Sequence, residues 1–261
     1  MLWLYNLPTW LLALFILGGF IVVAVLGLRL VHRRGRRHWL TSEADNGTVG
    51  WFFSGLTLFY GLLLGLLTVA SWGNYNQTMS VASQEAATIA TVYRNLAGYP
   101  KPVQNQLRYR LRQYVHLIIE RSWPTQQQGQ IPLSETKVLN LFQRQFLSQD
   151  QLTPAQLVLH GETIRSYNQL VELRRQRLQS IQSGVPGVIW AVVLLGAGAT
   201  LVFSYCFVVT NFRLHALLTG LLALIIGLLI FLLVVLDHPY WGEVSVSADP
   251  YRDVLTNLMI P

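Results

Sequence analysis

Charged residues are scarce in this 261-residue chain, and cysteine is almost absent. Asp, Glu, Lys and Arg make up 12% of the sequence against 52% hydrophobic residues, whereas a soluble domain carries roughly 25% charged residues. Together with a mean hydropathy of +0.39, this imbalance excludes an ordinary soluble protein and indicates a membrane protein. The single cysteine, Cys206, lies in an apolar run and is expected to be a small buried side chain. A disulfide framework or cysteine-based zinc site within the chain is therefore excluded.

The sequence also lacks the short motifs of common enzymes. Its six histidines show no HExxH or other metal-ligand spacing, and neither a G-x-S-x-G turn nor a glycine-rich phosphate loop is found. Acidic side chains in the C-terminal stretch DHPYWGEVSVSADPYRD could bind a cation, but a polar strap over the outer membrane face is favoured. We therefore expect no enzyme activity, no cofactor, no metal and no nucleic-acid partner.

Four apolar stretches are long enough to cross a bilayer, which takes roughly 20 residues of helix. They cover residues Trp10–Val31, Val49–Trp72, Val185–Val209 and Leu214–Leu236. Ionisable residues occur only at their ends, whereas coupled transporters usually carry such residues inside their spans. The sequence thus predicts four transmembrane helices and argues against coupled transport.

The charges in the short loops predict the orientation, because Lys and Arg in such loops stay on the cytoplasmic side. The N-terminal residues before the first span are uncharged, the tail after Leu236 is mainly acidic, and the third loop carries Arg213. The first loop and its flank contain five arginines: Arg29, Arg33, Arg34, Arg36 and Arg37. Both termini and residues 73–184 are therefore predicted on the periplasmic or lumenal side of a bacterial inner or internal membrane.

Helical periodicity continues through the long connector between the second and third spans. Breaks occur at Gly98–Pro102 and Trp123–Pro124, and Thr153–Pro154 has the pattern of a helix N-terminus. Gly73 is the only residue just after Trp72 that could break the helix. The second span is therefore predicted to continue as one helix to about Leu96. We predict an all-α membrane protein in four parts: residues 1–72 with two spans and the basic loop, an inserted extramembrane helical bundle at 73–184, two further spans at 185–236, and an acidic outer-face tail at 237–261.

An apolar stripe on the second span is a candidate pore constriction. Leu56, Phe59 and Leu63 recur at helical spacing, and hydrophobic constrictions can gate a pore by dewetting. The alternative is an ordinary face that packs against lipid or a neighbouring helix. The stripe by itself does not decide between these two interpretations.

Beyond Trp72 the same helix is polar but almost uncharged, which suits the wall of a water-filled vestibule. The candidate vestibule residues are Asn74, Thr78 and Glu85. Because Glu85 is the only charged residue between Asp45 and Arg94, it would either form the charged ring of the vestibule or pair with a bundle arginine such as Arg94.

Basic residues of the connector are candidates for attracting anions. Arg108 and Arg112 share a helix face, and Arg174 and Arg177 form a similar pair later. A cluster of positive charge raises the local concentration of anions. An ordinary solvated face is the alternative interpretation for both pairs.

Five segments resemble the bestrophin-like four-span membrane proteins of bacteria: NLPTWLL, QEAATIATVYR, YVHLIIERSWP, RLQSIQSGVPGVIW and LDHPYWGEVSV. The resemblance implies kinship with pentameric anion channels that have an apolar neck on the second helix. By analogy the neck would correspond to Leu56, Phe59 and Leu63. Bestrophins keep their large connector and both termini in the cytoplasm, which conflicts with the orientation predicted from the arginines. We retain the arginine-based orientation.

Two functions from different classes remain open. The first is a passive ion channel for anions, embedded in the lipid bilayer as a homo-oligomer, with its pore lined by the second span. The second is a non-catalytic membrane scaffold or accessory subunit, which would bind a larger membrane complex through the bundle and the acidic tail. A stable hetero-complex on purification, without a homo-oligomer, would favour the second.

Overall fold

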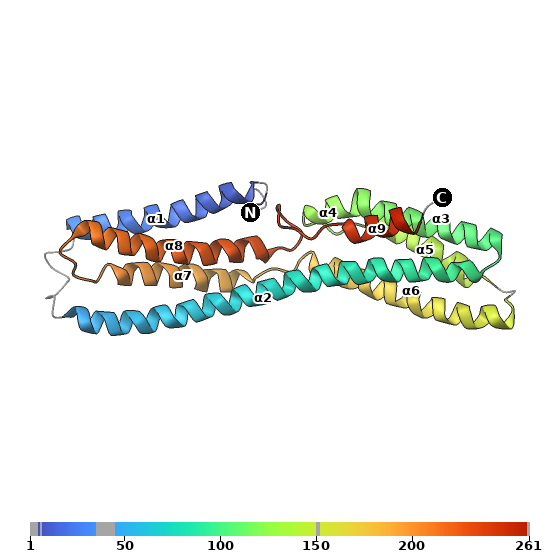
Figure 1. The fold of residues 1–261 in the computed structure, drawn as a ribbon, viewed down its shortest axis with the longest axis horizontal. Helices are drawn as coiled ribbons and strands as arrows, with labels where there is room; N and C mark the ends of the chain where they lie inside the picture. The colour runs from blue at the N-terminus through green and yellow to red at the C-terminus, as the bar shows by residue number, and fades with distance from the viewer. Residues whose placement is uncertain (1–4, 6, 35–44, 150–151, 260–261) are drawn as a thin grey trace. The chain divides into compact units, whose positions relative to one another are not determined.

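A computed structural model describes residue 5 and residues 7–34, 45–149 and 152–259 of the chain (Figure 1). Arg36 and Arg37 of the predicted basic loop lie outside the described residues, as does the side chain of Arg34. The described residues form helices and no strands. They divide into two compact units, to which α2 (Asn46–Asn95) contributes residues on either side of Gly73.

The first unit comprises Met1–Gly73, Gly184–Asp237 and Gly242–Val244. Besides α2, it contains α1 (Thr9–Arg34), α7 (Gly187–Ser204) and α8 (Phe212–Asp237). Each of these four helices is long and apolar enough to cross a membrane, which confirms the four predicted spans and an integral membrane protein.

Small side chains let the helices of this unit approach closely. α1 packs along α8 (Figure 1), and Ala24 and Ala223 are completely buried in the core of the unit. Tyr60 of α2 lies against Gly196 of α7, where an added Cβ would come within 2.5 Å of the ring. The Tyr60 hydroxyl donates to the Val193 carbonyl oxygen at 2.9 Å. A glycine at position 196 therefore allows this aromatic side chain to join α2 to α7.

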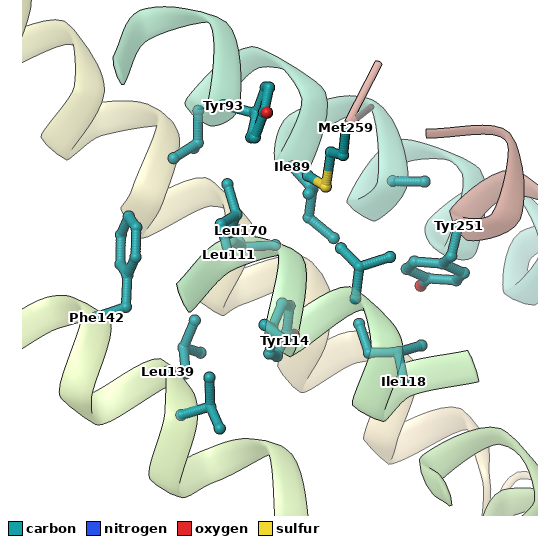
Figure 2. Packing of buried hydrophobic residues seen from close by; sticks show 14 of the residues in the cluster. Ile89, Tyr93, Leu111, Tyr114, Ile118, Leu139, Phe142, Leu170, Tyr251 and Met259 are labelled. Carbon is teal, nitrogen blue, oxygen red and sulfur yellow. The ribbon is translucent and has the colours of Figure 1, made fainter. Parts of the chain in front are cut away.

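The second unit, which we call the bundle, comprises Asn74–Ser183, His238–Trp241 and Ser245–Pro261. Its elements besides α2 are η3 (Leu96–Gly98), α3 (Lys101–Leu117), η4 (Ile118–Ser122), α4 (Trp123–Gln127), α5 (Ser134–Leu147), α6 (Pro154–Ser180) and α9 (Asp249–Asn257). Figure 2 shows side chains from several of these helices meeting in one apolar core, among them Ile89, Leu111, Phe142 and Leu170.

Local signals define most element boundaries in the bundle. The break at Gly98–Pro102 separates α2 and η3 from α3. Thr153 caps α6 in a capping box: its hydroxyl accepts from the Gln156 backbone N–H, and the Gln156 side chain accepts from the Thr153 N–H. Such reciprocal bonds satisfy two donors that a helix start leaves open.

The helix that begins as α3 does not end at Trp123–Pro124, contrary to the sequence-based expectation. It continues through the π turn η4 into α4, where Pro124 is the second residue. The Trp123 N–H bonds to the Ile118 carbonyl oxygen five residues earlier. The wider turn makes room for a proline ring that would clash in a regular α-helix.

The C-terminal tail packs into the bundle and does not form the separate acidic strap that the sequence predicted. Tyr240, Val246, Tyr251 and Met259 belong to the buried core, and Figure 2 shows Tyr251 and Met259 beside the core residues of the bundle. The Trp123 indole N–H donates to the Val246 carbonyl oxygen at 3.2 Å. The acidic residues Glu243, Asp249 and Asp253 lie between these apolar residues in sequence and are exposed, whereas Asp237 at the start of the tail is buried.

Candidate functional site

The apolar stripe of α2 lies at the surface of the first unit. Phe59 is 73% exposed, Leu56 is partly exposed, and Leu63 packs against the core while remaining partly accessible. Phe52, one turn before Leu56, is also exposed. This stripe is therefore available for contact with lipid, with another chain, or with the lumen of a pore.

Further along α2, the outward face in the bundle is uncharged and polar. The exposed or half-exposed residues recur every three or four positions and have short or amide side chains: Gln77, Ser80, Gln84, Ala87 and Thr91. This spacing averages 3.5 residues, which keeps the residues on one side of a long helix. The sequence pattern could have identified this face, but the predicted vestibule residues were chosen from a different side of the helix.

Two of the predicted vestibule residues occupy less accessible positions. Asn74 is half-buried, and its side-chain amide donates to the Ser183 hydroxyl at 3.2 Å. Thr78 is buried, and its hydroxyl donates to the Asn74 carbonyl oxygen at 2.9 Å. Thr78 therefore lies off the outward face of α2.

Glu85 is completely buried in the bundle. Its Oε2 atom accepts from Arg177 Nε at 2.6 Å and from the Tyr251 hydroxyl at 2.9 Å. Its Oε1 atom accepts from the Tyr114 hydroxyl at 3.0 Å. The carboxylate thus pairs with an arginine of the bundle, but with Arg177 of α6 rather than with Arg94, which is exposed near the end of α2.

A second buried carboxylate completes the ionic cluster. Glu135 Oε2 accepts from Arg177 Nη2 at 2.8 Å and from Arg174 Nε at 3.0 Å. Burial alone would raise the pKa of Glu135, but the guanidiniums of Arg177 and Arg174 and the Ser122 hydroxyl hold this pKa below its ordinary value of 4.5. Glu135 therefore contributes its full stabilisation above pH 4.5. This stabilisation is lost as the pH falls through the lowered pKa that Glu135 has in the folded protein.

Two guanidiniums balance two carboxylates in this cluster. Although burial disfavours the charged form of Arg177, Glu135 and Glu85 keep its pKa well above the ordinary value. Removing one member of such a buried ion pair would leave the other charge unpaired, so the pairs hold together the helices that supply them. The cluster therefore links α2, α3, α5, α6 and α9 and does not resemble an ion pathway.

Both sequence interpretations of Arg174 and Arg177, as residues that attract anions and as a solvated face, missed this cluster. Arg177 is completely buried, and Arg174 is mostly buried. A signal was present, since Arg177 falls in register with Leu170, Leu173 and Ile181 on the core face of α6. A charge in that register requires a buried partner of opposite sign.

The second predicted pair, Arg108 and Arg112, lies on α3 and is half-exposed. The guanidinium carbon of Arg108 lies 4.5 Å from the centre of the Tyr93 ring, within the range of a cation–π interaction. α3 carries no Asp or Glu. Its surface is therefore cationic and can attract anions over a distance set by salt screening.

Within the described ranges, no three His, Cys, Asp or Glu side chains gather in a way that could hold a metal ion. Two acidic residues of the tail have partners elsewhere in the chain or within the tail. Asp249 pairs with Arg252 at 2.8 Å, and Glu243 accepts from the Thr9 backbone N–H at 3.0 Å.

Comparisons with known proteins agree with this architecture. A family model described as the bestrophin-like domain matches residues 18–251. No curated protein matches the sequence. A crystal structure of a bacterial bestrophin homologue from Klebsiella pneumoniae, a single-residue variant, is 12% identical, with a TM-score of 0.65 over 94% of this chain and 98% of that one.

Other solved structures give the same result. A second variant of the Klebsiella pneumoniae homologue is 13% identical, with a TM-score of 0.62 over 94% of this chain and 97% of that one. A structure described only as a membrane protein is 12% identical, with a TM-score of 0.67 over 94% and 97% of the two chains. These likenesses show a shared fold and confirm the resemblance noted in the sequence.

Proposed function

Because this chain belongs to the bestrophin-like family, we propose that it is an oligomeric passive ion channel, selective for anions, whose pore is lined by α2. The observation that carries this proposal is the outward face of α2. It is apolar around Leu56 and Phe59 in the first unit, and uncharged and polar from Gln77 to Thr91 in the bundle. An apolar constriction followed by a wettable wall is the arrangement that a dewetting gate requires.

Two further features support a passive pore for anions. In the four apolar stretches that can span the membrane, ionisable residues occur only at the ends, whereas proton- or ion-coupled carriers depend on such residues within their spans. The cationic surface of α3, with Arg108 and Arg112, would raise the concentration of anions near the bundle. Selectivity in this proposal thus comes from long-range attraction, since Glu85 is neutralised by Arg177.

The first test is current recording from the purified protein in planar bilayers under a salt gradient. We expect unitary currents that reverse near the equilibrium potential of chloride. Gln84→Glu would place a carboxylate on the outward face of α2. This charge should shift the reversal potential of the current toward the equilibrium potential of the cation. Asn140→Glu, at an exposed position of α5, is the matched control and should leave the reversal potential unchanged.

Equal shifts in the two variants would argue against a pore along α2. Absence of currents, combined with a stable hetero-complex on native purification, would instead favour a scaffold or accessory subunit of a larger membrane complex.

We also propose that the bundle and both termini face the periplasm from a bacterial inner membrane, on the basis of the arginines in the first and third loops. In a Cys206→Ser background, a cysteine introduced at Asn140 should react with a membrane-impermeant maleimide in cells whose outer membrane has been permeabilised. Reaction only after lysis of the inner membrane would place the bundle in the cytoplasm.

A further inference from the structure

The loop between α4 and α5 exposes two large apolar side chains. Ile131 is 47% exposed and Leu133 is 77% exposed, on either side of the buried Pro132. The backbone of the loop is held just before them. The Gly129 N–H donates to the Gln126 carbonyl oxygen at 2.8 Å, and Gly129 has a φ of +73°, a conformation that favours glycine. An ordered turn thus presents these apolar side chains at the surface.

An open groove of about 460 Å³ adjoins this loop, a size within the range of small-molecule sites. Ile131 of the loop and Val171 and Leu178 of α6 supply its apolar lining. The Arg174 guanidinium ties α6 to the start of α5 beside the loop, since its Nη2 atom donates to the Thr136 hydroxyl at 2.9 Å. Because Ile131 belongs to both the loop and the groove, we treat them as one feature, the loop–groove surface: Ile131, Leu133, Val171 and Leu178.

The polar rim of the groove carries no unbalanced charge. It consists of two arginines and two glutamines: Arg174, Arg175, Gln179 and Gln182. Arg174 pairs with Glu135 at 3.0 Å. Arg175 pairs with Glu172 at 2.7 Å. Since both guanidiniums already have a carboxylate partner, a ligand of this groove is recognised mainly through its apolar part.

The groove lies close to a membrane-length helix along the chain. Gln182 of its rim precedes Gly187, the first residue of α7, by five residues. α7 is one of the four helices that can cross a membrane. A residue covers at most about 3.6 Å of chain, so Gln182 lies within roughly 18 Å of the start of this span. The groove is therefore within reach of the membrane surface.

The loop is held near the end of another membrane-length helix. Trp241 follows Asp237, the last residue of α8, by four residues, which corresponds to at most about 14 Å of chain. An added Cβ at Gly129 would come within 2.9 Å of the Trp241 ring, so the loop packs against this indole. Tryptophan favours the boundary between lipid and water. Two separate segments of the chain thus keep the loop–groove surface within reach of that boundary.

A phospholipid fits both the chemistry and the position of this surface. Its acyl chain is apolar and would cover the groove, as a neighbouring lipid covers the apolar side chains of an interfacial segment. Its ester and phosphate oxygens accept hydrogen bonds, which arginine and glutamine side chains donate. The bilayer also supplies this ligand at high local concentration beside α7 and α8.

We propose that the loop–groove surface binds a membrane phospholipid, with an acyl chain along Ile131, Val171 and Leu178 and with Leu133 inserted among the headgroups. Because affinity comes from apolar burial and the rim is neutral, zwitterionic and anionic phospholipids should bind alike, and salt should have little effect. Lipid binding at this surface is independent of the proposed ion conduction.

Photolabelling of the protein in lipid nanodiscs tests the groove. The probe is a phosphatidylcholine with a diazirine on one acyl chain, and the labelled peptides are identified by mass spectrometry. We expect labels on the peptides that contain Ile131 and Val171. Val171→Glu should lower this labelling about tenfold, because a carboxylate would have to lose its hydration beside the acyl chain. Val158→Glu, at an exposed position near the other end of α6, is the matched control and should leave labelling unchanged.

Fluorescence quenching tests the loop without altering the groove. In a Cys206→Ser background, an environment-sensitive fluorophore on Leu133→Cys should be quenched by phospholipids that carry a spin label near the headgroup. The control is Leu147→Cys, which is also exposed and lies at the opposite end of α5, roughly 20 Å further along the helix. Its fluorophore should not be quenched.

Equal labelling of the groove in Val171→Glu and Val158→Glu, or equal quenching at positions 133 and 147, would overturn the lipid site. Labelling that requires an anionic headgroup and disappears at high salt would also overturn it, because the headgroup charge would then be what is recognised. A lower native mass of Val171→Glu would show that another copy of the chain covers the groove. Currents in planar bilayers test the channel separately, so failure of the lipid site would leave that proposal standing.

Discussion

Replacing Arg177 with methionine is expected to lower the free energy of unfolding by about 3–5 kcal/mol, the range measured when one member of a buried ion pair is removed. The guanidinium is completely buried and donates to both Glu85 and Glu135. Without it, Glu85 would remain buried with no guanidinium partner, and Glu135 would keep only Arg174. The measurement is denaturant or thermal unfolding of the purified protein in detergent, followed by tryptophan fluorescence.

Arg165→Met, on the same helix, is the matched control. The Arg165 side chain is 79% exposed and pairs with Glu162 at 2.8 Å, and exposed pairs contribute less than about 1 kcal/mol. Adding Glu85→Gln and Glu135→Gln to Arg177→Met should recover part of the lost stability, because the unpaired charges are removed as well. Similar losses for Arg177→Met and Arg165→Met would contradict the central position of the ionic cluster.

Phe59→Ser is expected to raise the open probability of the proposed channel by about tenfold or more. A phenylalanine side chain resists hydration by about 1.5–3 kcal/mol, and roughly 1.4 kcal/mol corresponds to a factor of ten in a rate or population. Several copies of the side chain around one constriction would add to this effect. Recording in planar bilayers, with long-lived openings as the readout, measures the change.

Leu58→Ser provides the control for this experiment. Leu58 adjoins Phe59, is 69% exposed, and points away from the stripe because successive helix residues are about 100° apart. We expect its substitution to leave gating close to that of the parent protein. Equal gains in the two variants would mean that Phe59 does not form the constriction.

Together the two experiments separate the roles of two parts of α2. Phe59 belongs to an exposed apolar stripe, whereas Glu85 is held by groups from α3, α6 and α9. Any rearrangement of α2 in the bundle must therefore break or carry along a buried ion pair. Such a rearrangement would also involve α9, because the Tyr251 hydroxyl donates to Glu85.

Features that depend on residues close together in the chain were predictable. The four spans follow from the length of their apolar runs, and the continuation of α2 to Asn95 follows from the absence of any helix breaker beyond Gly73. The cap at Thr153 and the break near Gly98 likewise depend on local backbone preferences. The family could also be recognised, because short segments spread over the chain retain its pattern.

Partners separated by long stretches of chain were decided only by the tertiary structure. Arg94 was the nearest arginine to Glu85 in sequence, yet the partner is Arg177, 92 positions away. Likewise, the tail looked like an acidic strap until Tyr251 and Met259 were placed in the core. The sequence by itself determined that α2 is a long helix and that its part beyond Trp72 is polar and almost uncharged. Which charges meet in the interior was determined by packing, because a buried charge is stable only where another element brings a counter-charge to it.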